Sequence, residues 1–447
     1  MGFGLGLVSY IPLIAYIGFW VICILALTGR PLLGFYYMLP FLPYRTLRDH
    51  FLAYPLGNNM LTILVVAIIL GAILQGKHLP KSKLYVVWLI FGIFLYISMW
   101  YGTALGNAPA PLWLSDDNFT TWKDYMLIPL TFVAAGLVVE DRKAVRTVII
   151  ITAITLLFID RSCLLESMSR SWGTFDESKR DVGPLGYGSN QTAAFLGQFA
   201  MFFWGVVQFV KTKKYKLYFY GLIGLTIFAT MYTFSRGAYA AVLVSVFVLG
   251  ALKSRKLLVV AAVFLFTWQV VVPTPVRERI EMTQDSNGKL EASANERVQL
   301  WQAAQDSILS NPMLGTGFAT YQMKGHVANL RDTHNWYVKV LVETGVVGLI
   351  IVLVLLQQMM AVSYRLFKKA EDPLYRGLGL GLVLAITACI VANCFGDRWT
   401  YLEITGLLWA LVGTALRALE FSETEPVTET SIVVESPVAV NPYMVYR

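Results

Sequence analysis

Long apolar runs separated by short polar connectors dominate the chain. A helix needs about 20 mainly apolar residues to cross a bilayer, and twelve runs approach or exceed that length. They lie approximately at residues 5–27, 59–76, 84–104, 124–139, 143–159, 191–210, 216–233, 237–252, 256–272, 338–363, 377–395 and 401–418. The pattern predicts an all-α polytopic membrane protein with about 12 transmembrane helices.

A shorter apolar piece near residues 32–44 is interrupted by Pro40 and Pro43. Because proline disrupts a helix interior, we expect this piece to be a re-entrant or interfacial element. Counting it as a full span would instead give thirteen crossings and place the N-terminus outside. The remaining topology is the same in both cases.

Charge follows the same pattern. Only 14% of the residues are charged, whereas about 25% is usual for a soluble protein. The net charge is +8, and the basic residues gather in connectors near residues 77–83, 142–146, 211–216, 253–256 and 365–376. Such basic connectors mark the cytoplasmic side, so the basicity indicates topology and no nucleic-acid partner.

The outward-facing segments are then 105–123, 160–190, 273–337 and the short turn 396–399. In the one large extracytoplasmic loop, residues 273–337, Ser293-Ala294-Asn295-Glu296 matches a capping box, and Asn311-Pro312 ends the helix that follows. We expect this amphipathic helix to cover the mouth of the bundle and to bury Trp301.

This organisation predicts three regions. Residues 1–190 form N-terminal transmembrane helices with short outer loops, and residues 191–420 form a core that includes the 273–337 loop. Residues 421–447 are rich in Glu, Thr, Val and Pro and are expected to form a disordered cytoplasmic tail.

Four outer arginines run against the expected distribution of positive charge: Arg180, Arg236, Arg297 and Arg331, the last of which pairs naturally with Asp332. Arg236 stands in Thr233-Phe234-Ser235-Arg236-Gly237, between two spans, where a charge near hydrocarbon costs up to about 2.5–3.5 kcal/mol. Guanidinium groups match phosphate oxygens bidentately, so converging arginines suit a pyrophosphate. The alternatives are lipid-phosphate contact for Arg236, a solvated helix face for Arg297 and a local ion pair for Arg180.

His334 lies in Asp332-Thr333-His334-Asn335, at the start of a long apolar run. With Thr333 as N-cap, the helix N-terminus would lower the imidazole pKa and favour its neutral, basic form. A helix-capping role is the alternative. Gly345 and Gly348 follow at spacings that place them on the helix face of His334, where glycine permits close helix packing.

The sequence shows no metal-ligand pattern. Asp116-Asp117 is the only outer aspartate doublet and no histidine flanks it, while residues 28–58 contain only Asp49 as a carboxylate. We therefore expect chemistry without a metal.

Together these residues resemble the O-antigen ligase/polymerase family of bacterial surface polysaccharide assembly. The resemblance rests on Thr233–Ala238, on Arg297 with Trp301, on Asn311-Pro312-Met313-Leu314-Gly315-Thr316-Gly317, and on His334-Asn335 followed by nine residues and Gly345-Val346-Val347-Gly348. It implies a GT-C-like fold in the bacterial cytoplasmic (inner) membrane, with the active site facing the periplasm.

The resemblance further implies a lipopolysaccharide-type glycosyltransferase without metal, nucleotide sugar or other cofactor. A glycan would pass from a polyprenyl (undecaprenyl) diphosphate carrier to a hydroxyl of a glycan, lipid or protein acceptor, with inversion. Arg236 and Arg297 would bind the diphosphate, Arg180 matches a family arginine loosely, and His334 would activate the acceptor.

Three other functions are considered. A polymerase of the same family would use another lipid-linked repeat as acceptor, although the His334-Asn335 signature favours a ligase. A transporter or flippase for a lipid-linked saccharide would need ionisable groups deep in the membrane, and the predicted spans contain few. A structural scaffold would need none of this chemistry.

Overall fold

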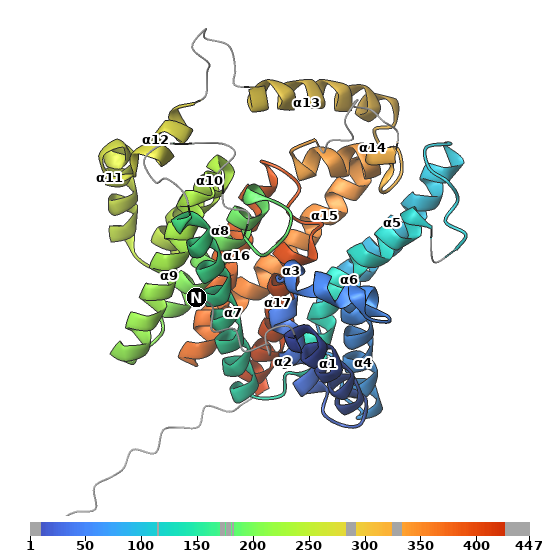
Figure 1. The fold of residues 1–447 in the computed structure, drawn as a ribbon, viewed down its shortest axis with the longest axis horizontal. Helices are drawn as coiled ribbons and strands as arrows, with labels where there is room; N and C mark the ends of the chain where they lie inside the picture. Colours follow the sequence, from blue (N-terminus) through green and yellow to red (C-terminus); the bar gives the residue numbers. More distant parts are fainter. Residues whose placement is uncertain are drawn as a thin grey trace, which may run out of the picture.

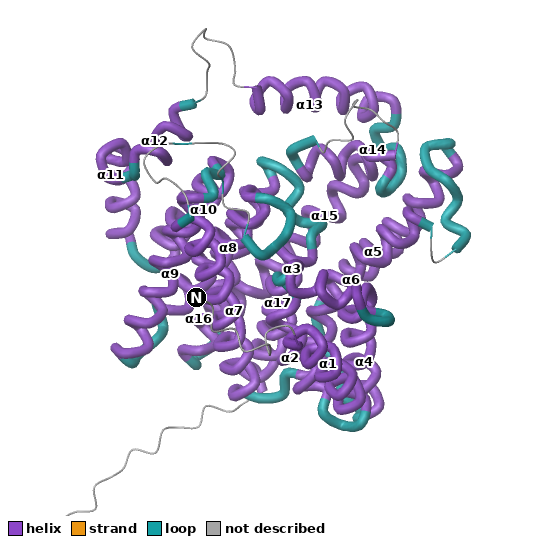
Figure 2. Tube along the Cα trace, in the orientation of Figure 1, coloured by secondary structure: helices purple, strands orange, loops and turns teal. Residues whose placement is uncertain are grey.

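The computed structural model is all-helical over the residues it describes, which are 10–113, 116–169, 175, 180, 183–282, 292–323 and 333–424 (Figures 1 and 2). Each of the twelve predicted runs coincides with a helix. The helices are α1 (Ile11–Leu27), α2 (Pro31–Phe41), α3 (Arg45–Asp49), η2 (His50–Ala53), η3 (Gly57–Asn59), α4 (Met60–Leu74), α5 (Lys83–Ala104), α6 (Asp117–Val138), α7 (Arg142–Met168), α8 (Ser189–Val207), α9 (Lys213–Tyr232), α10 (Arg236–Leu252), α11 (Arg255–Val271), α12 (Thr274–Glu281), α13 (Ala292–Ser310), α14 (Thr320–Met323), α15 (Trp336–Lys369), α16 (Pro373–Asn393) and α17 (Leu402–Thr424).

Six described helices are long and apolar enough to cross a membrane, and the pair α11 and α12, bent by 107°, would make seven. The six are the segment 57–74 that includes α4, and α5, α7, α15, α16 and α17. Helices α1 and α10 are apolar but shorter. The protein is therefore a polytopic membrane protein, and the total of twelve spans stays a prediction.

The apolar piece near residues 32–44 contains α2, an 11-residue helix with Pro40 in its last turn. At about 1.5 Å per residue it is too short to cross the hydrocarbon core alone. It packs against α1, α4 and α7.

The centre of the bundle is formed by α8, α16 and α17, most of whose residues are buried. Helix α16 packs against α8, α10, α15 and α17. A methyl group on Gly205 of α8 would lie 2.5 Å from the Cα atom of Gly381 on α16. This close approach requires glycine on both helices, as is common where membrane helices associate.

The described parts of the segments expected to lie outside gather at one end of the bundle (Figure 1). Helix α13 lies across this end above α14, and α12 lies beside α10 (Figure 1). The segment expected at 160–190 begins later than predicted, because α7 continues to Met168. Asp160 stays inside the helix because it is buried and accepts a hydrogen bond from Thr226 Oγ1 at 2.6 Å.

The loop helix expected after the capping box is confirmed as α13, which ends at Ser310 just before Asn311-Pro312. The side chains of the capping box lie outside the described residues, as does Asp332. At the other boundary, α17 runs four residues past the expected end of the core, and residues from 425 onward lie outside the described range.

Candidate functional site

Two of the predicted arginines meet at the turn between α9 and α10. Arg180 donates from Nε to the Thr233 carbonyl oxygen at 3.0 Å and from a terminal nitrogen to Asn190 Oδ1 at 2.7 Å. Arg236 begins α10 and donates to the carbonyl oxygen of Met282, just after α12, at 2.8 Å. The turn between these two apolar helices is therefore followed directly by Arg236, and the Arg180 guanidinium is hydrogen-bonded to its backbone.

A third arginine, which the sequence analysis missed, joins them. Arg279 of α12 is 5% exposed, and its guanidinium lies 5.0 Å from the ring centre of Phe175. Arg180 and Arg279 both lie close enough to the Tyr239 hydroxyl to interact with it electrostatically. The sequence contained the information needed to find Arg279, because this arginine lies in an outward-facing segment. The same feature identified Arg236. We call Arg180, Arg236 and Arg279 the arginine cluster.

Aromatic packing holds this turn in an unusual backbone conformation. Phe234 has φ +55°, a left-handed value that costs a residue with a side chain about 1–2 kcal/mol. Its ring packs edge-on against Phe175 at 5.0 Å and Tyr232 at 5.9 Å, and Val276 of α12 completes the cluster. Apolar contacts therefore position the turn. The guanidinium groups of its arginines remain able to bind polar partners.

His334 does not lie where the helix pattern predicted. The N-cap of α15 is Asn335, whose side-chain oxygen accepts hydrogen bonds from the backbone N–H groups of Tyr337 and Val338. Thr333 instead bonds through its hydroxyl to the Asn335 carbonyl oxygen at 2.7 Å. His334 precedes the helix with φ +52°, so its imidazole is not part of the first turn. Strained backbone of this kind is concentrated at functional sites.

The expected continuous helix face from His334 to the two glycines is also wrong, because α15 is broken at Gly345. This residue has φ +65° and ψ −168°, a combination essentially limited to glycine. The segment 312–317 fills the break: Val346 N–H donates to the Pro312 carbonyl at 2.9 Å, and Gly317 N–H donates to the Glu343 carbonyl at 2.9 Å. The two glycine-containing motifs are thus one structural unit.

Gly348 has a different neighbour. A methyl group there would lie 3.0 Å from the ring of Phe94 on α5, so this position is close to another helix. It would also collide with the Thr344 side chain of α15 itself.

Helix α13 connects the large loop to the histidine. Trp301 is 42% exposed, so the prediction that it is buried is wrong; Leu300, Ala304 and Ser307 are buried instead, among the side chains of this helix that the structure describes. The Trp301 indole N–H reaches the Thr333 carbonyl oxygen at 2.9 Å. Arg297 lies four residues earlier, on the same side of the helix as Trp301. This places the backbone of Arg297 about one turn from the contact beside His334.

The first turns of α15 are anchored by the outer turn 396–399. The Trp336 ring stacks on Trp399 at 5.0 Å, and Lys339 Nζ lies 3.0 Å from Asp397 Oδ2. Asp397 is 1% exposed and also accepts hydrogen bonds from the backbone N–H of Trp399 and from Thr400. The local sequence gives no sign of this anchoring, because both partners lie more than 50 residues away along the chain.

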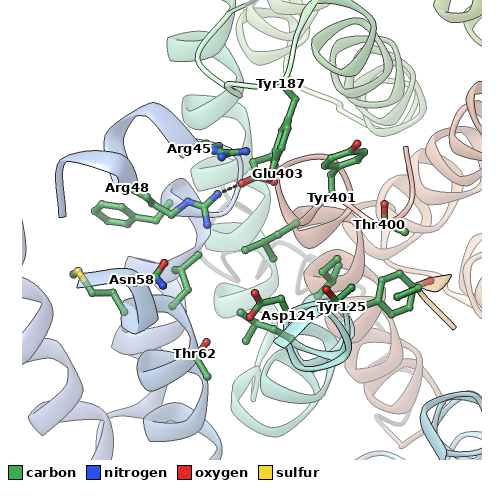
Figure 3. Close-up of a pocket in the computed structure, with 18 of the residues that line it drawn as sticks. Arg45, Arg48, Asn58, Thr62, Asp124, Tyr125, Tyr187, Thr400, Tyr401 and Glu403 are labelled. Carbon is green, nitrogen blue, oxygen red and sulfur yellow. Dashed lines mark hydrogen bonds and ion pairs between the residues drawn. The ribbon is translucent and has the colours of Figure 1, made fainter. Parts of the chain in front are cut away.

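A cavity of about 580 Å³ opens between the N-terminal helices and the first turns of α15 and α17. Its polar lining includes Arg45, Arg48, Asn58, Thr62, Asp124, Lys339, Thr400 and Glu403, and its aromatic lining includes Tyr125, Tyr187, Trp336 and Tyr401 (Figure 3). We call this cavity the chamber. None of Arg180, Arg236, Arg297 and His334 lines it, but Trp336 is only two residues from His334.

Several charged groups of the chamber contact other groups of its lining. Arg48 pairs with Glu403, and Arg45 lies 4.2 Å from the ring centre of Tyr187 (Figure 3). Partial burial, with a smaller contribution from Glu403, raises the pKa of the Tyr187 hydroxyl to about 12. Tyr187 is therefore a neutral hydrogen-bonding group at physiological pH.

Within the described residues, no group of three or more His, Cys, Asp or Glu side chains lies close enough together to hold a metal ion.

Comparison with protein families gives one finding that bears on this geometry. Residues 221–353 match the O-antigen ligase family. The match runs from α9 into α15 and includes Arg236, Arg279, Arg297, His334 and the break at Gly345, whereas Arg180 lies before it. Comparison with curated proteins gives no match.

Proposed function

We propose that this membrane protein, whose residues 221–353 form an O-antigen ligase domain, transfers a glycan from a polyprenyl (undecaprenyl) diphosphate carrier to an acceptor hydroxyl. The transfer would take place at the outer face of the bacterial cytoplasmic membrane, with a ligase-type acceptor. The observation that carries the proposal is the convergence of Arg180 and Arg236 on one turn inside a membrane protein.

In the proposed reaction, the acceptor oxygen attacks the anomeric carbon of the glycan. The new oxygen–carbon bond forms as the bond from that carbon to the diphosphate oxygen breaks, and the configuration inverts. The neutral imidazole of His334 accepts the hydroxyl proton, and the diphosphate leaves with the bonding electron pair. A positioned general base contributes about 10²–10⁴-fold to the rate.

The arginines stabilise the departing diphosphate. Guanidinium forks bind phosphate oxygens bidentately, and groups preorganised toward developing charge often supply the largest part of catalysis. Arg180 and Arg236 would hold the diphosphate, and Arg297 would approach it from α13. The mechanism uses no metal, so addition of EDTA is expected to leave the rate unchanged.

The proposal is tested with purified full-length protein in nanodiscs and lipid-linked donor and acceptor extracted from a strain that lacks this gene. His334→Ala is expected to retain undecaprenyl diphosphate binding while turnover falls about 10²–10⁴-fold. Arg236→Lys keeps the charge but loses the fork, so donor affinity is expected to fall about 10- to 100-fold, the scale of a hydrogen bond to a charged group.

Arg255→Lys is the matched control, because Arg255 is an exposed arginine at the start of α11. It is expected to behave as wild type. Full activity in Arg236→Lys would contradict the argument that a guanidinium fork binds the diphosphate. Unchanged turnover in His334→Ala would show that His334 is not the general base.

The acceptor class is tested by mass analysis of the glycan that accumulates in the deletion strain. Long chains left on the carrier support a ligase. Single unpolymerised repeats on the carrier would contradict this assignment and make the protein a polymerase.

A further inference from the structure

The chamber is a cavity separate from the arginine cluster, since none of Arg180, Arg236 and Arg279 lines it. Its volume of about 580 Å³ lies within the usual range of ligand sites, roughly 300–1,000 Å³. Its walls come from elements far apart in the sequence, such as α4, α6 and the start of α17. Because Trp336 lines it, a ligand in the chamber would lie next to the segment that carries His334.

The lining combines aromatic faces with short polar side chains. Tyr125 and Asp124 of α6 lie across the chamber from the Arg48–Glu403 pair, with Asn58 and Thr62 to one side, on the N-terminal elements (Figure 3). Sugars present apolar C–H faces together with hydroxyl groups that both donate and accept. Aromatic rings pack well against the C–H faces, and amide, hydroxyl and carboxylate groups form hydrogen bonds with the sugar hydroxyls.

The charge of the chamber does not suit an anion. The lining cations, Arg45, Arg48 and Lys339, do not outnumber the lining carboxylates, Asp49, Asp124, Glu343 and Glu403. Arg48 is paired with Glu403 and Lys339 with Asp397. The arginine cluster, in contrast, brings three guanidinium groups to one turn.

We infer that the chamber binds the acceptor as an uncharged saccharide, while the carrier diphosphate occupies the arginine cluster. This inference rests on the proposed function. It assigns neutral sugar units, without phosphate or carboxylate, to the part of the acceptor that enters the chamber. The attacking hydroxyl then reaches the reaction from the Trp336 side of His334.

The test separates acceptor from donor in the nanodisc assay. Thr62→Trp places a large side chain in the chamber, and Thr62→Ser is the matched control that keeps the hydroxyl. Asn58→Ala is a milder second variant, because Asn58 is exposed and its truncation leaves α4 intact. Melting temperature identifies variants that do not fold.

We expect Asn58→Ala to raise the acceptor KM by about tenfold, the effect of one lost hydrogen bond, and Thr62→Trp to raise it further. Neither variant should change undecaprenyl diphosphate affinity. Inorganic pyrophosphate should inhibit competitively against the donor and non-competitively against the acceptor.

Three results would overturn the inference. Weaker undecaprenyl diphosphate binding in the folded Asn58→Ala variant would assign the chamber to the carrier. An acceptor KM unchanged in both variants would leave the chamber without a role in binding, and competition between pyrophosphate and acceptor would show that the chamber takes anions. Absence of transfer by the wild-type protein would instead refute the proposed function itself.

Discussion

Substitution of Gly345 by alanine tests whether the break in α15 is required. The backbone at Gly345 has φ +65° and ψ −168°, which a residue with a side chain rarely adopts. The added methyl group would also lie 2.3 Å from the carbonyl carbon and oxygen of Met313 and 2.5 Å from the nitrogen of Leu314. These are backbone atoms, so the whole segment 312–317 must move.

Two contributions determine how strongly Gly345→Ala destabilises the protein. Backbone strain at such a position costs about 1–3 kcal/mol. Displacement of the segment would break two hydrogen bonds, from Val346 N–H to the Pro312 carbonyl oxygen and from Val347 N–H to the Met313 carbonyl oxygen. Each such hydrogen bond contributes about 0.5–1.5 kcal/mol. We therefore expect Gly345→Ala to destabilise the protein by about 2–6 kcal/mol.

Thermal unfolding in detergent and hydrogen exchange of residues 312–317 measure this effect. Gly224→Ala on α9 is the matched control, because nothing lies within 4 Å of a methyl group there, and it should change stability by less than about 1 kcal/mol. Gly345→Ala should lower the melting temperature, expose the segment to exchange and reduce glycan transfer. A variant that matches Gly224→Ala in all three would refute the structural role of the break.

Two further predictions concern the surroundings of the site. Trp301→Phe removes the donor to the Thr333 carbonyl, so Thr333, next to His334, loses its hydrogen bond to α13. Turnover should therefore fall while undecaprenyl diphosphate affinity stays unchanged. Kinetics equal to those of the wild type would contradict this. Tyr187 has a pKa raised from 10.0 to about 12 by partial burial and by Glu403, so its contribution to stability is complete below about pH 10 and is lost as pH rises toward 12. Tyr187→Phe should flatten the fall of melting temperature over that interval, and an unchanged pH profile would count against the raised pKa.

The helices could be predicted from the sequence because each apolar run is a local signal. Asn311-Pro312 likewise marked the end of α13, whereas α2 continues through Pro40 to Phe41. The end of α7 was misplaced because Asp160 reads as a surface residue, whereas its partner Thr226 keeps it buried. That partner lies on another helix and leaves no trace in the local pattern.

The sequence likewise identified part of the site correctly and misplaced part of it. Arg180 and Arg236 were found from charge in unexpected places, and the structure brings both to the α9–α10 turn. The position of His334 was wrong because helical periodicity assumes a continuous helix, whereas Asn335 caps α15 and Gly345 breaks it.

The chamber could not be predicted. Its central ion pair joins Arg48 to Glu403, which are 355 residues apart, and no spacing rule connects them. Three-dimensional packing alone brings these two walls together.

The central claim is that the arginines of the α9–α10 turn hold the carrier diphosphate beside His334. An electron cryomicroscopy structure of the protein with undecaprenyl diphosphate tests it most directly. We predict phosphate oxygens within hydrogen-bonding distance of Arg180 and Arg236, with the His334 imidazole next to the bound diphosphate. Diphosphate density in the chamber on Arg48, or at a place remote from both arginines, would contradict the account.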